Sequence, residues 1–199
     1  MGKVWYNIIS CLWGEFMKPI GSGILSTSRL ILRPPQREDA EALVRIKSLP
    51  MKIEEAQKAV AGMLDELRKP FTFHWVITLG DEVIGRIKAW DVNPYDGYLQ
   101  LGYDMGPEYR CKGYMSEAVQ AVVRFMMTDA QANRVFCSVR AGNTASRRVC
   151  EKAGMALEGK TVVVYSIGNF PTLRCLEQIR NDCAYHGANV KIVCVGAGF

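Results

Sequence analysis

The sequence predicts a single domain of the α/β (α+β) class, in which helices flank a mixed, mostly antiparallel central sheet. The first observation is the order of the elements: strand, two helices, three strands, helix, strand, helix and strand. The second is that the strand segments alternate apolar and polar residues, whereas the helical segments place apolar residues three and four positions apart. The third is the length of 199 residues, which suits one domain with a substantial buried core.

Prolines and turn residues bound the elements of the first half. The expected elements are a strand at 29–33, helices at 37–48 and 53–68, and strands at 71–79 and 82–91. Pro34 and Pro35 stop the first strand because proline donates no hydrogen bond to a β-ladder. Pro50 separates the two helices, and each helix has one apolar stripe. Gly80 and Asp81 form the tight turn between the paired strands.

The elements of the second half follow a turn cluster at 93–97. They are a strand at 98–105, a helix over 118–127, a strand at 134–140, a helix at 143–152 and a strand at 157–167. Gly154 ends the second of these helices. Beyond Gly168 the pattern predicts a helix at 172–185 and a final strand at 190–195.

Residues 1–24 are predicted to be an N-terminal extension to a domain that occupies residues 25–199. The apolar run at 4–13 is too short to span a bilayer. It also lacks the basic start and the small-residue cleavage site of a signal peptide. We expect this run to form an extra helix that packs on the domain or on a partner.

Composition and charge narrow the class of protein. The chain is 49% hydrophobic and 23% charged, which is typical of a globular protein. Its net charge of +5 suits a polyanionic ligand, but no run of lysines and arginines predicts a nucleic-acid interface. The seven cysteines are scattered and only two histidines accompany them, so we expect free thiols and no metal site. These features predict a cytoplasmic protein with no membrane partner, either a monomer or a homodimer.

The segment 107–118 joins the strand at 98–105 to the next helix and has the composition of an anion-binding loop. Gly113 lets the backbone approach a ligand closely because it has no Cβ. Free backbone N–H groups and the helix dipole suit a phosphate at such a helix N-terminus. Arg110 and Lys112 add positive charge beside it. An ordinary strand-to-helix connection with two surface cations explains the same residues equally well.

Several motifs, in order, resemble those of the GNAT superfamily of N-acetyltransferases. Residues 110–115 resemble the Arg/Gln-x-x-Gly-x-Gly/Ala loop that holds the pyrophosphate of acetyl-CoA in that superfamily. Met115 replaces the last small residue of the loop, a variation of the ribosomal-protein N-terminal (Rim-type) branch. The further matches are residues 25–34, residues 38–40, Ile84 with Gly85, Arg134, residues 143–146 and residues 151–155. The resemblance covers about residues 25–160.

This resemblance implies a GNAT-like fold and an N-acetyltransferase. Such an enzyme transfers the acetyl group of acetyl-CoA, its cosubstrate, to a primary amine by direct attack in a ternary complex. The Rim-type branch implies a protein N-terminus as acceptor, and it also contains enzymes for small amines. A different class of function stays open, namely a non-catalytic acyl-CoA-binding sensor or interaction module. Gln100 and the divergent segment after Gly168 favour that alternative.

The resemblance also implies which residues form the site. The expected cofactor-binding residues are Tyr103, Asp104, Met105, Arg110, Cys111, Lys112, Gly113, Tyr114, Met115, Asn143 and Ser146. We expect Ser146 to be catalytic by donating a hydrogen bond to the leaving thiolate. Asn143 is also a good N-cap of its helix, and capping alone would explain it, but we favour the ligand role because it accompanies the loop motif. Cys150 stands where many relatives outside the Rim-type branch have a tyrosine acid, and we expect it to be a buried helix residue.

The general base is not identified by the sequence. Some relatives have a carboxylate on the central strand where this chain has Gln100, which cannot take a proton. Asp104, Asp91 and Glu82 are nearby alternatives, and a chain of water molecules is another. His74 alternates away from its apolar neighbours, so we expect a strand residue rather than a catalyst. Two arginines, Arg147 and Arg148, are more typical of a solvated helix face than of a phosphate site.

Overall fold

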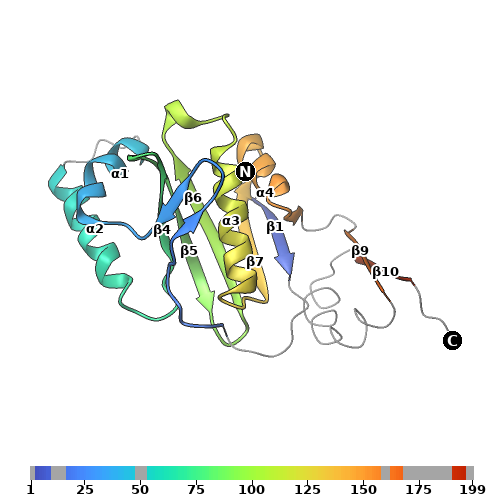
Figure 1. Cartoon of the computed structure of the whole chain (residues 1–199). Coiled ribbons are helices and arrows are strands. Elements are labelled where there is room, and N and C mark those ends of the chain that lie inside the picture. The colour runs from blue at the N-terminus through green and yellow to red at the C-terminus, as the bar shows by residue number, and fades with distance from the viewer. Residues whose placement is uncertain (1–2, 10–16, 48–52, 158–161, 168–189, 196–199) are drawn as a thin grey trace.

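The computed structural model describes residues 3–9, 17–47, 53–157, 162–167 and 190–195. Its main sheet has eight strands in the order β2-β3-β4-β5-β6-β7-β1-β8. These strands are β1 Lys3–Ile9, β2 Leu25–Ser26, β3 Ile31–Arg33, β4 His74–Leu79, β5 Glu82–Asn93, β6 Tyr98–Met105, β7 Arg134–Arg140 and β8 Ala156–Leu157. The helices are α1 Ala40–Lys47, α2 Ile53–Glu66, α3 Tyr114–Thr128 and α4 Thr144–Lys152 (Figure 1). The predicted α+β class with a mixed, mostly antiparallel sheet is therefore confirmed.

The helices cover the two faces of the sheet, and strand alternation decides which residues meet them. On β4, Trp75 and Ile77 point into the larger core, which contains the buried residues of α3 and α4. Val76, between them, points into the smaller core under α1 and α2. Because successive side chains of a strand point to opposite faces, α1 and α2 lie on one face and α3 and α4 on the other. None of the described helices combines the length and the apolar character needed to span a bilayer.

The strands β6 and β7 form the one parallel pair within the main sheet, and they soon diverge. Their pairing covers only Tyr98 to Gln100 against Arg134 to Phe136. β6 nevertheless continues to Met105 and β7 continues to Arg140. The two strands therefore leave a slot between them in the middle of the sheet.

The N-terminal run forms a strand, so the expectation of an extra helix is wrong. β1 pairs with β7 along its whole length and with β8 on its other side. The reason is a period of two: Val4, Tyr6 and Ile8 pack against the larger core, while Lys3 and Trp5 are exposed. An apolar run that alternates in this way suits a strand that is covered on one face.

The remaining differences concern element boundaries. The first expected helix begins with a short 3-10 turn at Arg37–Asp39 before α1. Within the strand expected at 157–167, the described residues belong to β8 at its start and to β9 Val162–Ile167 at its end, which lie in different sheets. The predicted strand at 190–195 is confirmed as β10 Val190–Val195, which pairs in parallel with β9 in a separate two-stranded sheet. The helix expected at 172–185 lies outside the described residues.

We predict that Tyr6 stabilises the whole domain. The substitution Tyr6→Ala should lower the free energy of unfolding by about 3 to 5 kcal/mol, because it empties a fully buried aromatic site. For a domain of this size the melting temperature should fall by roughly 10 °C. Thermal unfolding followed by circular dichroism measures the change, with Lys3→Ala on the same strand as the control. An unchanged melting temperature for Tyr6→Ala would show that β1 is detachable from the fold.

Candidate active site

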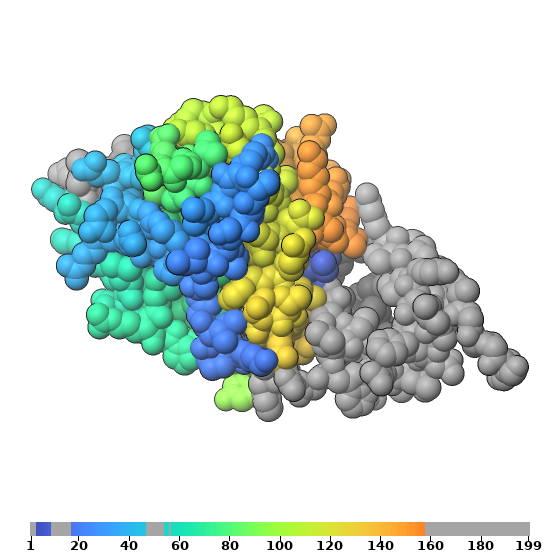
Figure 2. Space-filling view, viewed as in Figure 1, coloured from blue at the N-terminus to red at the C-terminus, as the bar shows by residue number. Residues whose placement is uncertain are grey.

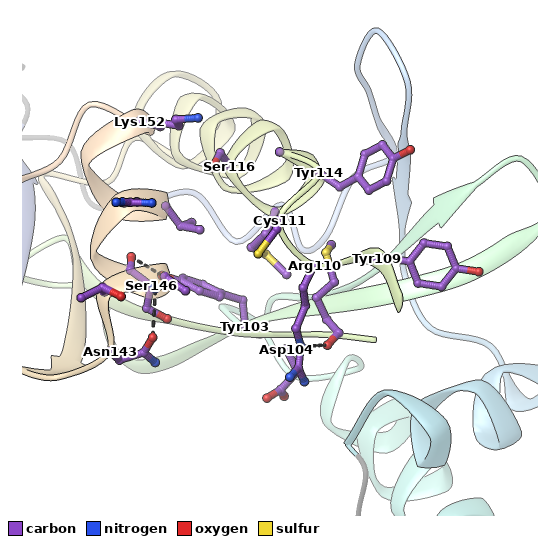
Figure 3. Close-up of a pocket in the computed structure, with 17 residues that line it drawn as sticks. Tyr103, Asp104, Tyr109, Arg110, Cys111, Tyr114, Ser116, Asn143, Ser146 and Lys152 are labelled. Atoms are coloured by element: carbon purple, nitrogen blue, oxygen red, sulfur yellow. Dashed lines mark hydrogen bonds between the residues drawn. The ribbon is translucent and has the colours of Figure 1, made fainter. Parts of the chain in front are cut away.

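A cavity of about 650 Å³ lies where the end of β6 faces the first turns of α3 and α4 (Figure 3). All of the predicted cofactor-binding residues line it except Lys112, whose Nζ lies 5.7 Å from the ring centre of Tyr109. The lining residues not expected in this role are Tyr109, Ser116, Thr144, Ala145, Arg148, Val149 and Lys152. Arg148 therefore does not belong to a purely solvated helix face. Arg147 and Arg148 were expected to share one solvated helix face. Arg147 instead donates to the Tyr6 hydroxyl at 3.1 Å.

The loop from β6 to α3 is shaped by two residues with positive φ. Cys111 has φ of 61° and Gly113 has φ of 84°, a conformation that glycine adopts without strain. Arg110 folds back, and its Nε donates to the carbonyl oxygen of Met105 at 3.0 Å. Gly113 is the N-cap of α3, and no side chain of the described residues caps this end of the helix. The first-turn N–H groups and the positive end of the helix dipole therefore face the cavity, as an anion requires.

A salt bridge between Arg29, which lies just before β3, and Glu117 of α3 fixes this loop from outside. Arg29 donates to Glu117 through Nε at 2.7 Å and through Nη2 at 2.6 Å. Its Nη1 donates to the carbonyl oxygen of Lys112 at 3.3 Å, and its guanidinium lies 4.6 Å from the ring centre of Tyr114. Figure 2 shows this early segment, in blue, lying alongside α3 in yellow. From the sequence, Arg29 was expected only to be part of a strand. Its role at this loop could not be predicted because its partner Glu117 lies 88 positions away.

Glu117 carries its negative charge in the first turn of α3. Burial opposes that charge, but hydrogen bonds from the Thr27 hydroxyl, from Arg29 and from the Ser28 hydroxyl outweigh burial and lower the Glu117 pKa to about 2. These three residues donate through the two hydroxyls, the backbone N–H of Arg29 and its Nε, at 2.6 to 3.1 Å. The carboxylate is thus fully ionised and fully paired at neutral pH.

The α4 side of the cavity is held by two side chains that meet at Ser146. Asn143 is the N-cap of α4, and its Oδ1 accepts from the backbone N–H of Ser146 at 3.1 Å. Tyr103, reaching across from β6, donates its hydroxyl to the carbonyl oxygen of Ser146 at 3.2 Å. Burial and the neighbouring Cys150 raise the pKa of Tyr103, so its hydroxyl stays protonated. Figure 3 shows Tyr103, Asn143 and Ser146 converging at the edge of the cavity.

Cys150 is fully buried, as expected for a packed helix residue. Its Sγ lies 3.4 Å from the Tyr103 hydroxyl. Many relatives outside the Rim-type branch have a tyrosine at the position of Cys150. Here a tyrosine hydroxyl lies beside Cys150, but it belongs to Tyr103 of β6 and not to α4. The hydrogen bond with Cys150 and burial raise the pKa of the nearby Cys137 thiol. The same hydrogen bond lowers the pKa of the Cys150 thiol. Both sulfur atoms are buried, so the pair packs as part of the core.

Of the carboxylates considered as general bases, only Asp104 lines this cavity. Asp104 accepts from Arg86 at 2.6 Å, so its charge is already paired. Glu82 lies 3.0 Å from Arg45 at the start of β5. Asp91 is exposed, with φ of 46°. Gln100 lies at the last paired position of β6 against β7.

The family model described as an acetyltransferase (GNAT) domain matches residues 29–156. An uncharacterized N-acetyltransferase of Bacillus licheniformis is 28% identical over 149 residues, which cover 68% of this chain and 83% of that protein. A ribosomal-protein-serine acetyltransferase of Escherichia coli (strain K12) is 26% identical over 106 residues, which cover 53% of this chain and 59% of that protein.

Solved structures show the same fold. A GNAT-family acetyltransferase from Bacillus anthracis superposes with a TM-score of 0.57 at 22% identity, over 69% of this chain and 86% of that chain. The ribosomal alpha-N-protein acetyltransferase RimL, solved in complex with coenzyme A, superposes with a TM-score of 0.63 at 22% identity, over 69% and 86%. The strand β1 lies outside the residues that the family model matches.

We predict that Glu117→Gln destabilises the protein at neutral pH and that this difference disappears in acid. A carboxyl group whose folded pKa is about 2 and whose ordinary value is 4.5 stabilises the fold above pH 4.5 and loses that effect as the pH falls toward 2. The gap in melting temperature between wild type and variant should therefore be full at pH 6 to 7 and shrink below pH 4.5. Glu41→Gln, at an exposed first-turn carboxylate of α1, is the control. A gap that does not change with pH would contradict the assignment.

Proposed function

The chain belongs to the GNAT family of acetyltransferases, and we propose that its cavity binds acetyl-CoA and presents the acetyl group to a primary amine such as a protein N-terminus. The observation that carries this proposal is the uncapped N-terminus of α3 behind Gly113, which opens into the cavity beside β6. A relative of known acceptor class supports the finer part: the matched Escherichia coli protein is named as a ribosomal-protein-serine acetyltransferase.

The residues at the α3 end suit the phosphates of CoA. The backbone of Gly113, Tyr114 and Met115 presents N–H donors, since the first turn of a helix leaves such groups without intrahelical partners. Arg148 and Lys152 line the α4 side of the same cavity and add positive charge. A cavity of about 650 Å³ is within the range of ordinary cofactor sites.

The slot between β6 and β7 suits the pantetheine arm and the thioester. Beyond Gln100, the β7 side of β6 is unpaired within the described sheet. Main-chain groups there are available to the arm, and an N–H of this strand is available to the thioester carbonyl. A preorganised N–H donor stabilises the oxyanion that forms on amine attack.

Ser146 is placed to assist the leaving thiolate. It lies in the first turn of α4, lines the cavity, and has its backbone held by Asn143 and Tyr103. A serine hydroxyl is a weak acid, so its role is a hydrogen bond to the developing thiolate charge rather than full proton transfer. Cys150 lies one turn further along the helix in the core.

The proposed function predicts that the protein binds acetyl-CoA and that it acetylates an amine. These two properties can be measured separately. Acetyl-CoA at 100 times its Kd should stabilise the native state by about 2.7 kcal/mol, and the melting temperature should rise with concentration. NAD and ATP serve as controls, and a shift with either of them but none with acetyl-CoA would refute the site. CoA release with peptides, polyamines and aminoglycosides then tests turnover. Tight binding without turnover on any acceptor would favour the CoA-binding sensor.

We predict that Ser146→Ala lowers kcat by about one to three orders of magnitude, because it removes a donor used in the transition state. Cys150→Ala should keep kcat within a few-fold and lose only packing. Steady-state rates on the best acceptor measure both, with melting temperatures as the check on folding. A crippled Cys150→Ala enzyme beside a nearly normal Ser146→Ala enzyme would reverse the assignment and give Cys150 the acid position.

A further inference from the structure

The slot between β6 and β7 can also be approached from the face of the sheet opposite the cavity. The cavity lies on the α3 and α4 side. On the other face, the register places His74, Lys88 and Gly102 side by side on β4, β5 and β6. Gly102 stands just beyond the last residue of β6 that pairs with β7. This row therefore runs along the α1 and α2 face of the sheet toward the slot.

Trp90 connects this row to the slot. A Cβ at Gly102 would collide with the Nε1 atom of Trp90, so the indole lies against the glycine backbone. The Nζ of Lys88 lies 4.6 Å from the centre of the Trp90 ring. Trp90 is 49% exposed, so its ring offers an apolar contact to a carbon chain that approaches the slot.

A carboxylate lies over the same row. Glu66, the last residue of α2, places Oε2 3.2 Å from Lys88 Nζ and 3.5 Å from His74 Nε2. We name Glu66, His74 and Lys88 the Glu66 cluster. Glu66 is half-exposed, with 48% of its side chain accessible, so an incoming ammonium group can reach its free oxygen.

His74 is the unexplained member of the cluster. It is 3% exposed, and its Nε2 makes no hydrogen bond with any residue that the structure describes. Burial and the Lys88 charge lower its pKa to about 4, against a smaller opposing effect of Glu66. The imidazole is therefore neutral at neutral pH and is aimed at the Glu66 carboxylate. Buried polar groups without a partner are rare and often belong to a functional site.

We propose that Glu66 binds the ammonium group of the acceptor and takes its proton, which makes Glu66 the general base of the transfer. This inference rests on the proposed function. The N–H bond of the ammonium breaks and an O–H bond forms on Glu66. The neutral amine attacks the thioester carbonyl, the C–N bond forms and the C–S bond breaks. The nitrogen loses its second proton to the departing CoA thiolate, which leaves as the thiol. The exposed carboxyl group then loses its proton to solvent.

The cluster suits this task better than the other carboxylates. Asp104 on the same face accepts two bonds from Arg86, at 2.7 and 2.6 Å, and Glu82 is paired with Arg45. Glu66 is also paired, but among the described residues through a single longer hydrogen bond of 3.2 Å from Lys88 to Oε2, which leaves its other oxygen to an incoming ammonium group. Lys88 lowers the pKa of Glu66, which keeps the carboxylate ionised and able to bind a cation. The same shift makes Glu66 a weaker base, so removal of the proton is the more costly part of the step. The charged or titratable groups facing Glu66 are Lys69 next to α2, His74 on β4 and Lys88 on β5. Arg86 on β5 acts on His74.

The test compares Glu66→Gln with Glu55→Gln, an exposed carboxylate on the same helix. At pH 7, kcat/KM for the acceptor should fall by about 10²- to 10⁴-fold in Glu66→Gln and stay unchanged in Glu55→Gln. The rise in melting temperature with acetyl-CoA should be equal in both variants and wild type. Because Glu66→Gln depends on amine already neutral in solution, its deficit should narrow as the pH rises toward the pKa of the acceptor. A merely structural role for Glu66 would leave the deficit constant with pH.

A second variant tests the electrostatics of the cluster. Lys88→Met removes the cation that contributes most to lowering the Glu66 pKa, so the acid limb of the pH–rate profile should move to higher pH. Equal kcat/KM for Glu66→Gln and Glu55→Gln from pH 6 to 9, in an enzyme that turns over, would overturn Glu66 as the base and leave the proposed function intact. Absence of turnover in wild type on every acceptor would overturn both.

Discussion

The site depends on the early divergence of β6 and β7. Two parallel strands in the middle of a sheet ordinarily pair along their length, because unpaired backbone groups away from water are costly. Here the pairing stops after Gln100 and Phe136. β7 is satisfied on its other side by β1, and Tyr103 reaches from β6 to the carbonyl oxygen of Ser146 on α4. These contacts stabilise an open slot, and the backbone donors along it are the groups that a thioester-bearing arm requires.

A second constraint concerns charge at the N-terminus of α3. A carboxylate in the first turn of a helix stabilises the helix, but a free one would also repel the phosphates of a ligand at that end. Glu117 resolves this conflict because its charge is taken up by Arg29, Thr27 and Ser28. Arg29 in addition binds the carbonyl oxygen of Lys112. The same salt bridge therefore fixes the loop and leaves its N–H groups to an anion.

Local patterns in the sequence predicted most of the fold and the loop that lines one side of the cavity. Gly113 and its neighbours are adjacent in the chain, so their spacing alone indicated a turn into a helix. The helix expected near the N-terminus was wrong because the alternation of Val4, Tyr6 and Ile8 has meaning only when β7 lies beside it. The pairs Arg29 with Glu117 and Glu66 with Lys88 join distant elements. No spacing rule within one element can reveal such contacts.

The position of α4 also depends on contacts with elements that are distant in the sequence. Asn143 caps the helix from its own loop, and Tyr103 holds Ser146 from β6. The third support is Tyr6 of β1, whose hydroxyl accepts from Arg147 and donates to Glu151, both at 3.1 Å. Because β1 lies outside the span matched by the family model, one support of α4 comes from a part of the chain that the family pattern does not define. The orientation of Ser146 toward the cavity is therefore a property of the complete sheet, and a loss of β1 would disturb the site without changing any residue that lines it.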